Sequence, residues 1–237
     1  MDLMTLLAIF CLLMVAVAFS PLGLGGGILY VPIMHYMLDW EIKEAIVASL
    51  TLVLMVSLGS SLAHSKSGHA DHRVAKWGRI AAVPSATIGV LLSGVLLSLV
   101  GDIGIKILAA LVITFVLERT IRKSVEHTVE YTEEQLLEKR NQYLAGSSSA
   151  GIAAGILGIG GGAILVTLNR SMLKMDAKKA AGTSYLVTAT IVPVALLSHL
   201  LINQNIEQIV ENSGIIAMFL VPLMVFISAF FGAKYAI

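Results

Sequence analysis

The sequence contains little charge. Of its 237 residues, 13% are Asp, Glu, Lys or Arg and 57% are hydrophobic, whereas soluble domains average about 25% charged residues. The charged residues are clustered, which leaves long apolar stretches. A hydrocarbon core about 30 Å thick requires helices of roughly 20 apolar residues. The composition therefore excludes a soluble globular protein and predicts a single all-α membrane domain over residues 1–237, embedded in a lipid bilayer.

Several other features are scarce or missing. Cys11 is the single cysteine, so no intrachain disulfide can form. The formal net charge is +1, which indicates neither nucleic-acid binding nor an acidic partner. No Asp or Glu lies deep within an apolar segment, so a carboxylate-based sodium or proton site has no predicted position. The apolar segments also contain no metal-ligand cluster and no nucleophile-base pair, so we predict neither an enzyme nor a cofactor.

Four apolar segments are long enough to cross a bilayer unaided: residues 45–64, 80–100, 180–202 and 215–233. Residues 103–117 would cross if the helix were extended or if Lys106 snorkelled to the interface. The segments that flank two glycine clusters are shorter. Between the two halves of the chain, residues 119–143 are highly charged, which predicts a solvated helical connector.

Residues 20–64 are repeated at residues 155–199. A shift of 135 places Gly23-Leu-Gly-Gly-Gly on Gly158-Ile-Gly-Gly-Gly and gives 13 identities in 45 positions without a gap. Self-similarity at a fixed shift indicates a duplicated unit. We predict a first repeat over residues 1–118 and a second over residues 144–237. The second repeat ends where residues 103–117 would have their equivalent, so its final helix is expected to be absent, and a homodimer is one way to cover that gap.

Lysine and arginine placement predicts the orientation of the repeats. If each glycine cluster is the tip of a re-entrant hairpin, each repeat has an odd number of crossings and the second repeat is inverted. This topology leaves only Lys43 and Lys106 on one side and puts 14 basic residues on the other: Lys66, Arg73, Lys76, Arg79, Arg119, Arg122, Lys123, Lys139, Arg140, Arg170, Lys174, Lys178, Lys179 and Lys234. By the positive-inside rule, the basic side and the connector at residues 119–143 are cytoplasmic in a multi-pass protein of the cell membrane. A spanning first segment is the alternative.

The glycine clusters form the predicted binding site. Consecutive glycines cost a helix roughly 1 kcal/mol each relative to alanine, which predicts unwound backbone at Gly25, Gly26, Gly27, Gly160, Gly161 and Gly162. Unwound backbone inside a membrane must line a protein or water cavity. An apolar helix-forming stretch follows each cluster, so two helix N-termini would converge near the midplane. Their N–H groups and positive dipole ends suit a small anion.

The glycines have two other interpretations. Glycines in membranes also allow close helix packing, although packing motifs are spaced one helical turn apart whereas these glycines are contiguous. A nucleotide-binding glycine loop would need a preceding strand in a βαβ unit, which the sequence does not offer.

Polar residues follow each cluster at matching positions. Ser49, Thr183 and Ser184 lie near the start of the next spanning helix, where their hydroxyls would complete the hydrogen bonds of the anion. The alternative is local bonding to the preceding helical turn. His64 and His199 are related by the same shift of 135. Each ends a helix and is predicted to be interfacial, with a ligand or proton-carrier role as the alternative.

The doubled pattern resembles the TauE/SafE family of membrane permeases. It consists of Gly23-Leu-Gly-Gly-Gly-Ile-Leu-Tyr-Val-Pro32 and Gly158-Ile-Gly-Gly-Gly-Ala-Ile-Leu-Val, each followed by Ala-x-x-x-Ser. The basic segment Lys66-Ser-Gly-His-Ala-Asp-His-Arg73 is similar to the loop after the first spanning helix of that family. The chain departs from the family pattern in lacking the last helix and in having Thr167 where the first copy has Pro32.

The resemblance implies transport of sulfite, sulfoacetate or related sulfur-containing anions. Together with the residue pattern, it predicts a transporter of a small anion, sulfite or an organosulfonate, that works by alternating access around the two half-helix N-termini. A passive anion channel and a non-transporting membrane subunit are the alternatives.

Overall fold

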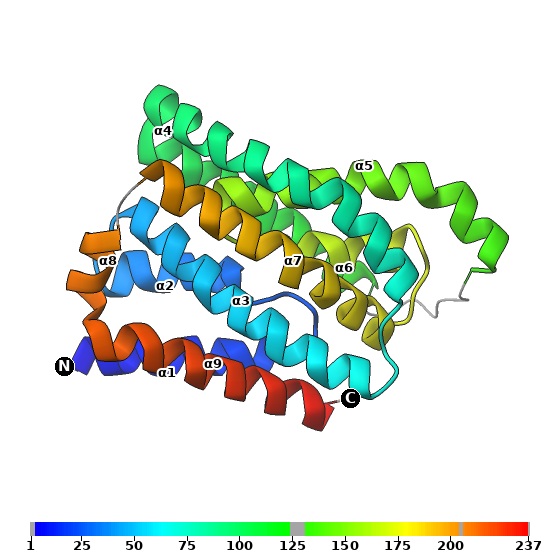
Figure 1. Cartoon of the computed structure of the whole chain (residues 1–237), viewed down its shortest axis with the longest axis horizontal. Helices are drawn as coiled ribbons and strands as arrows, with labels where there is room; N and C mark the ends of the chain where they lie inside the picture. The colour runs from blue at the N-terminus through cyan, green and yellow to red at the C-terminus, as the bar shows by residue number, and fades with distance from the viewer. Residues whose placement is uncertain (1–2, 124–130, 204–205, 237) are drawn as a thin grey trace.

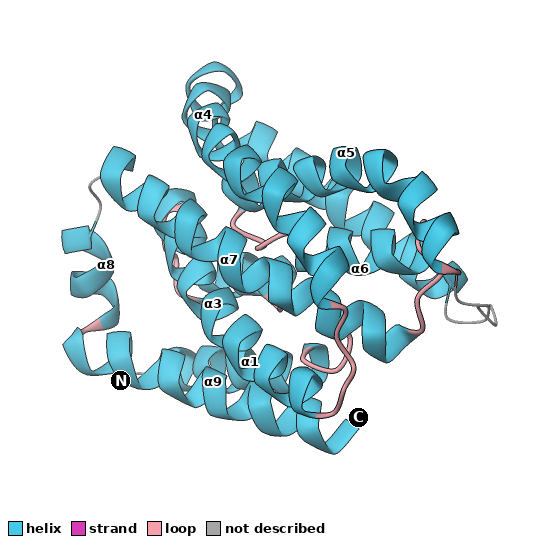
Figure 2. Cartoon of the chain, turned by 45° about the vertical axis from the view of Figure 1, so that its right-hand side comes forward, coloured by secondary structure: helices cyan, strands magenta, loops and turns pink. Residues whose placement is uncertain are grey.

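The computed structural model describes residues 3–123, 131–203 and 206–236, and within these residues every regular element is an α-helix. This confirms the all-α class (Figures 1 and 2). The helices are α1 (Leu3–Phe19), α2 (Gly27–Met37), α3 (Ile42–Lys66), α4 (His72–Lys123), α5 (Glu133–Leu157), α6 (Gly162–Ser171), α7 (Ala177–Asn203), α8 (Ile206–Ser213) and α9 (Ile215–Ala236).

Four helices are long and apolar enough to cross a membrane: Ile42–Lys66, His72–Gly101, Ala177–Ile202 and Ile216–Ala236. They contain the four segments that the sequence predicted to span, except for Ile215 at the start of the fourth. Within α4 the chain reverses at Gly101, whose φ of 63° and ψ of −170° are not helical. The apolar stretch Ile103–Val112 beyond it is shorter than these four spans.

The backbone repeats at the same shift as the sequence. Helix α6 begins 135 residues after α2, and α7 begins 135 residues after α3. Positive φ values recur at the same shift, at Gly23 and Gly158, at Gly25 and Gly160, at Gly26 and Gly161, and at Asp39 and Lys174. Asp39 and Lys174 are the two non-glycine residues with positive φ among those described. The duplicated sequence therefore specifies the same local path twice.

The two halves pack into one bundle. In Figure 1, α3 and α7 lie side by side at the centre and run in opposite directions, with α1 against α9 on one flank and α4 against α5 on the other. The short helices α2 and α6 lead away from the centre toward opposite ends of the bundle (Figure 1). The outer faces are apolar, as a lipid-facing surface requires: Leu99, Leu201 and Phe219 are all exposed.

Glycine does serve close packing between α4 and α5. A Cβ at Gly151 or Gly155 would overlap the carbonyl oxygen of Ala82 or Ala86, and one at Gly89 would overlap that of Ile152. Gly151 and Gly155 are one helical turn apart, which is the spacing expected of small-residue packing in membranes. The contiguous glycines at the predicted site are arranged differently.

Helix α5 crosses the predicted boundary between the connector and the second repeat. Thr132 and Gln135 form a capping box, and the helix then continues from Glu133 through residue 144 to Leu157. Residues 133–143 contain no glycine or proline that would end it. Arg73 donates a hydrogen bond to Glu133, which holds the pKa of that carboxyl below its usual value. The part of the predicted connector at residues 124–130 lies outside the described residues.

Candidate functional site

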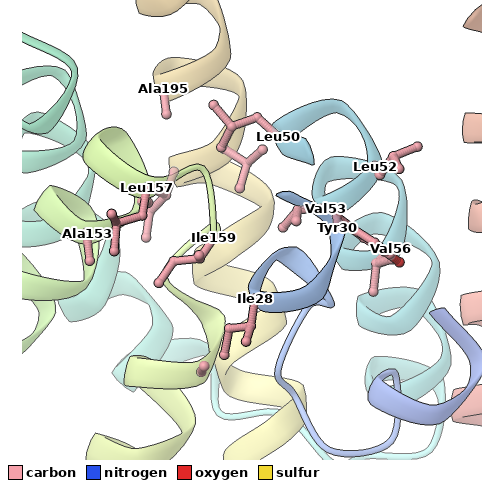
Figure 3. Packing of buried hydrophobic residues seen from close by; sticks show 14 of the residues in the cluster. Ile28, Tyr30, Leu50, Leu52, Val53, Val56, Ala153, Leu157, Ile159 and Ala195 are labelled. Atoms are coloured by element: carbon pink, nitrogen blue, oxygen red, sulfur yellow. The ribbon is translucent and has the colours of Figure 1, made fainter. Parts of the chain in front are cut away.

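The two glycine clusters lie against each other in the interior. A Cβ at Gly27 would stand 2.7 Å from Cα of Ile159, and one at Gly162 would stand 2.9 Å from the carbonyl oxygen of Gly23. All six predicted glycines are buried. Figure 3 shows Ile28, at the start of α2, near Ile159, in the loop before α6. Below, residues 23–27 are called the first tip and residues 158–162 the second tip.

Each tip turns the chain into a helix N-terminus without a side-chain cap. Gly26 and Gly161 are the N-caps of α2 and α6, with φ of 80° and 72°, and neither helix has a side-chain hydrogen bond at its cap. The left-handed conformation is routine only for glycine. The first N–H groups of a helix have no partner within it and carry the positive end of its dipole. The arrangement therefore places two electropositive helix starts side by side.

Ser49 and Ser184 join the two tips by reciprocal hydrogen bonds. The Ser49 hydroxyl on α3 donates to the Gly158 carbonyl at 2.9 Å, and the Ser184 hydroxyl on α7 donates to the Gly23 carbonyl at 3.1 Å. Ser184 also contacts the carbonyl of Ala181 at 2.9 Å, one turn earlier. A hydroxyl has one proton. Both serines thus contact the tips, and in this conformation their protons are directed at backbone carbonyls.

Thr183 lies apart from the tips. Its Oγ1 accepts a hydrogen bond of 2.9 Å from the backbone N–H of Asp71, in the loop between α3 and α4. The side chain is buried and fastens this loop to α7. Among the three predicted hydroxyls, the structure therefore brings Ser49 and Ser184 to the glycines and directs Thr183 elsewhere.

Two tyrosines that the sequence did not single out reach the first tip. The Tyr185 hydroxyl on α7 accepts a hydrogen bond from the Gly25 N–H at 3.4 Å and donates to the Phe19 carbonyl at 2.8 Å. Tyr30 extends from α2 toward α3 beside Val53 and Val56 (Figure 3). A Cβ at Gly26 would stand 2.8 Å from the Tyr30 hydroxyl oxygen, which is buried and has no hydrogen-bond partner.

The junction of the tips is polar on one side and apolar on the other. Thr188 of α7 has a buried hydroxyl without a partner, 3.4 Å from the position of a Cβ at Gly162. The equivalent residue of α3 is Val53, whose side chain a Cβ at Gly160 would overlap. Two positions related by the repeat thus carry a hydroxyl and an isopropyl group. The backbone is nearly symmetric, and the side chains around it are not.

Two adjacent pockets have volumes of about 190 Å³ each. The first reaches Gly27 and Ile159 at the tips and is lined by Lys106, whose ammonium lies 5.6 Å from the centre of the Tyr36 ring. The second is lined by Lys43, together with Ser93, Gly94, Ser98 and His199. Ile46 and Ile105 line both. These are the two lysines that the charge count assigned to the non-cytoplasmic side.

Both repeat-related histidines are buried, which corrects the prediction that they are interfacial. His64 is 0% and His199 2% exposed. The Nδ1 atom of His64 lies 3.0 Å from the Ser60 carbonyl, and Nε2 of His199 lies 2.7 Å from the Gly155 carbonyl. Their positions at helix ends did not reveal that neighbouring elements cover them.

A buried carboxylate was also missed. Glu44, in the first turn of α3, is 2% exposed and accepts a hydrogen bond of 2.8 Å from the Asn212 side chain of α8. It lies in the first turn of a membrane-crossing helix, where the helix dipole favours a negative charge. Glu44 is buried because α8, an element that the sequence analysis did not predict, supplies Asn212.

Comparisons with known proteins indicate a membrane transporter. The fold is that of an all-helical membrane protein. A family model described as Sulfite exporter TauE/SafE matches residues 7–237, so the chain belongs to that family. It is also similar to a probable membrane transporter protein of Methanocaldococcus jannaschii, with 26% identity over 210 residues that cover 84% of this chain and 73% of the relative. No solved structure matches the chain.

Proposed function

We propose that the protein transports a small anion, sulfite or an organosulfonate such as sulfoacetate, and binds it at the junction of the two tips. The observation that carries the proposal is the contact between the two uncapped helix starts, beside the partnerless buried hydroxyls of Tyr30 and Thr188. Buried hydroxyls without partners cost roughly 1–3 kcal/mol each. An oxyanion would accept hydrogen bonds from these hydroxyls and from the N–H groups of the tips, which offsets that cost.

Alternating access would use the inverted arrangement of the repeats. The first pocket gives a route to Gly27 and Ile159 from the end of the bundle where Lys106 lies. The Ser49 hydroxyl donates to the Gly158 carbonyl, and the Ser184 hydroxyl donates to the Gly23 carbonyl. These bonds hold each tip against the long helix of the other repeat. Movement of one repeat against the other around the tips would open the opposite route, toward the side that carries the other 14 basic residues and the connector. Family membership supports a sulfur oxyanion as the substrate class.

Reconstitution into liposomes tests this function. We expect uptake of radiolabelled sulfite or sulfoacetate, competed by the other, and accumulation above the external concentration when an ion gradient is imposed. Downhill flux without accumulation would favour a passive channel. Absence of anion flux and of anion binding by folded protein would favour a non-transporting subunit.

Thr188→Val provides a targeted variant. It removes the hydroxyl, nearly preserves side-chain shape and reproduces the residue that the first repeat has at position 53. Loss of one hydrogen bond to a charged ligand should weaken affinity about tenfold, equivalent to about 1.4 kcal/mol. Thr190→Val is the matched control, because the Thr190 hydroxyl donates locally to the Val187 carbonyl at 2.7 Å. Equal affinities in the two variants would remove Thr188 from the site.

A further inference from the structure

Four fully buried polar side chains form a cluster beside the first tip. They are Tyr30 of α2, Ser60 and His64 of α3, and Tyr185 of α7, each with an exposed fraction of 0%. The His64 and Tyr185 rings lie with their centroids 5.7 Å apart, and the Tyr185 hydroxyl meets the Gly25 N–H. Tyr30 lies close enough to Tyr185 to interact with it electrostatically, and the Ser60 hydroxyl faces the Tyr185 hydroxyl from beyond the length of a normal hydrogen bond. The cluster therefore extends the site from the tip to the end of α3.

Three atoms of this cluster have no hydrogen-bond partner: the hydroxyl oxygens of Tyr30 and Ser60, and Nε2 of His64. A buried polar atom without a hydrogen-bond partner is uncommon, and three such atoms in one cluster destabilise the fold considerably. The two hydroxyls can donate to an anion. The character of His64 Nε2 depends on which ring nitrogen carries the proton.

The bond at the other ring nitrogen settles the tautomer. Nδ1 of His64 lies 3.0 Å from the Ser60 carbonyl oxygen, and a carbonyl oxygen can only accept. The proton of the neutral ring is therefore on Nδ1, and Nε2 presents a lone pair to the cluster. An anion oxygen also presents lone pairs and would be repelled by it. An anion can bind against Nε2 only if a proton lies between them.

We propose that the protein binds its anion together with one proton, held at Nε2 of His64. The proton has two possible origins with the same outcome. A fully ionised anion such as a sulfonate binds as the imidazole takes up a proton, and Nε2–H then donates to an anion oxygen. A singly protonated oxyanion brings its own proton and donates it to the Nε2 lone pair. This inference rests on the proposed function and adds its coupling ion.

The other titratable groups around His64 are few. His69 faces it from the loop after α3, and Tyr185 faces it from α7, with Tyr30 of α2 beyond. The titratable residues of α9, which packs against α3, are Lys234 and Tyr235, both exposed near the end of that helix. Lys66, two residues after His64 on α3, directs its ammonium toward the Phe230 ring, 6.0 Å from the ring centre. Among the described residues, His69 is the charged or titratable group that acts on the ring and no carboxylate does so, and a bound anion would therefore be the counter-ion of the protonated imidazole.

Binding calorimetry on the purified full chain tests the proposal with methanesulfonate, which stays ionised across the working range. Heats measured in buffers of different ionisation enthalpy give the number of protons taken up. We expect an uptake approaching one proton above pH 7, and a dissociation constant that rises about tenfold per pH unit there, since unperturbed imidazoles titrate near 6.5. Sulfite, which binds as its singly protonated form, should show the same loss of affinity.

Two variants separate His64 from other sources of protons. His64→Gln should bind methanesulfonate with an affinity that is constant between about pH 6 and pH 8, because the amide donates without titrating. His199→Gln, at the equivalent position of the second repeat, should keep the wild-type pH dependence. Proton uptake that persists in folded His64→Gln would assign the proton to another group, such as Glu44, and overturn the proposal.

If His64→Gln fails to fold or loses binding at every pH, the wild-type measurement still tests whether a proton binds with the anion, and His199→Gln still tests whether the equivalent histidine holds it. Methanesulfonate binding without proton uptake by the wild-type protein would overturn the proton proposal while leaving anion transport intact. Absence of binding and flux for every sulfur oxyanion tested would instead overturn the proposed function itself.

Discussion

Ser49 and Gly158 are 109 residues apart, and the hydroxyl of the first donates to the carbonyl of the second at 2.9 Å. The repeat-related bond between Ser184 and Gly23 crosses in the opposite direction. Each long central helix therefore holds the glycine tip of the other repeat. This reciprocity explains how unwound backbone is stabilised in the interior, where a carbonyl without a partner is costly.

Ser49→Ala should lower the free energy of unfolding by about 1–3 kcal/mol, because it orphans the buried Gly158 carbonyl. Ser184→Ala should lower it less, since the Ser184 proton is shared between the Gly23 and Ala181 carbonyls. Chemical unfolding in detergent micelles measures both. Ser98→Ala is the control, because the exposed Ser98 hydroxyl bonds only to the Val95 carbonyl one turn earlier. A Ser49→Ala effect no larger than that of Ser98→Ala would contradict the role of the crossed bonds.

Gly25→Ala and Gly160→Ala separate the binding role of glycine from its packing role. Their φ values are 76° and 75°, so the strain of a left-handed alanine, about 1–2 kcal/mol, is common to both. A Cβ at Gly25 meets Val53 at an ordinary 3.4 Å, whereas one at Gly160 overlaps Val53 and meets Val192 at 3.2 Å. We expect Gly160→Ala to be the less stable protein by melting temperature. Gly25→Ala should instead lose anion affinity, about tenfold or more, at better-preserved yield.

Valine at the N-caps Gly26 and Gly161 repeats this comparison with a larger side chain. At Gly26 the new Cβ meets the movable end of the Tyr30 ring at 2.7 Å, whereas at Gly161 it meets the Ala150 carbonyl oxygen at 2.6 Å. The sequence pattern alone predicts near-normal yield for both variants. The structure restricts that expectation to Gly26→Val and predicts poor folding for Gly161→Val, measurable by size-exclusion chromatography. Equal yields with equal loss of binding would show that the Ala150 contact relaxes easily.

The sequence predicted the backbone of the site better than its side chains. Contiguous glycines and a shift of 135 residues were sufficient to place the tips and the starts of the following helices, because these depend on local conformation. Tyr185 was missed because its contacts with Phe19 and Gly25 join segments about 160 residues apart. Comparing the repeats would have helped: Leu50 stands where the second repeat has Tyr185. A hydroxyl that only one repeat carries indicates a role other than packing, because the other repeat packs without it.

Lys106→Ala should reduce anion uptake at limiting substrate several-fold, because the ammonium lines the pocket that leads to Gly27 and Ile159. A positive charge near the mouth of a pocket raises the local anion concentration, and salt screens this effect over a Debye length of about 8 Å at physiological ionic strength. The difference in anion uptake between Lys106→Ala and the wild-type protein should therefore become smaller as an inert salt is added. Lys139→Ala, at a half-buried position of α5 that does not line this pocket, is the control. A deficit independent of salt would indicate a structural role for Lys106.

Lys43 and Lys178 offer a direct test of whether the repeats are inverted. They are 135 residues apart, each is exposed, and each is the second residue of its long helix, α3 or α7. An inverted repeat puts equivalent residues on opposite sides of the membrane. Single cysteines at these positions, in a Cys11→Ser background, should therefore react with an impermeant thiol reagent from opposite sides. We expect Lys43→Cys to label from outside intact cells and Lys178→Cys only after the cytoplasmic face is exposed.

Ser67→Cys, exposed just after α3, should follow Lys178→Cys, because α3 carries the chain across the bilayer between residues 43 and 67. Labelling of Lys43→Cys and Lys178→Cys from the same side would make the repeats parallel. The two half-helices would then enter from one face, and alternating access around their meeting point would lose its structural basis.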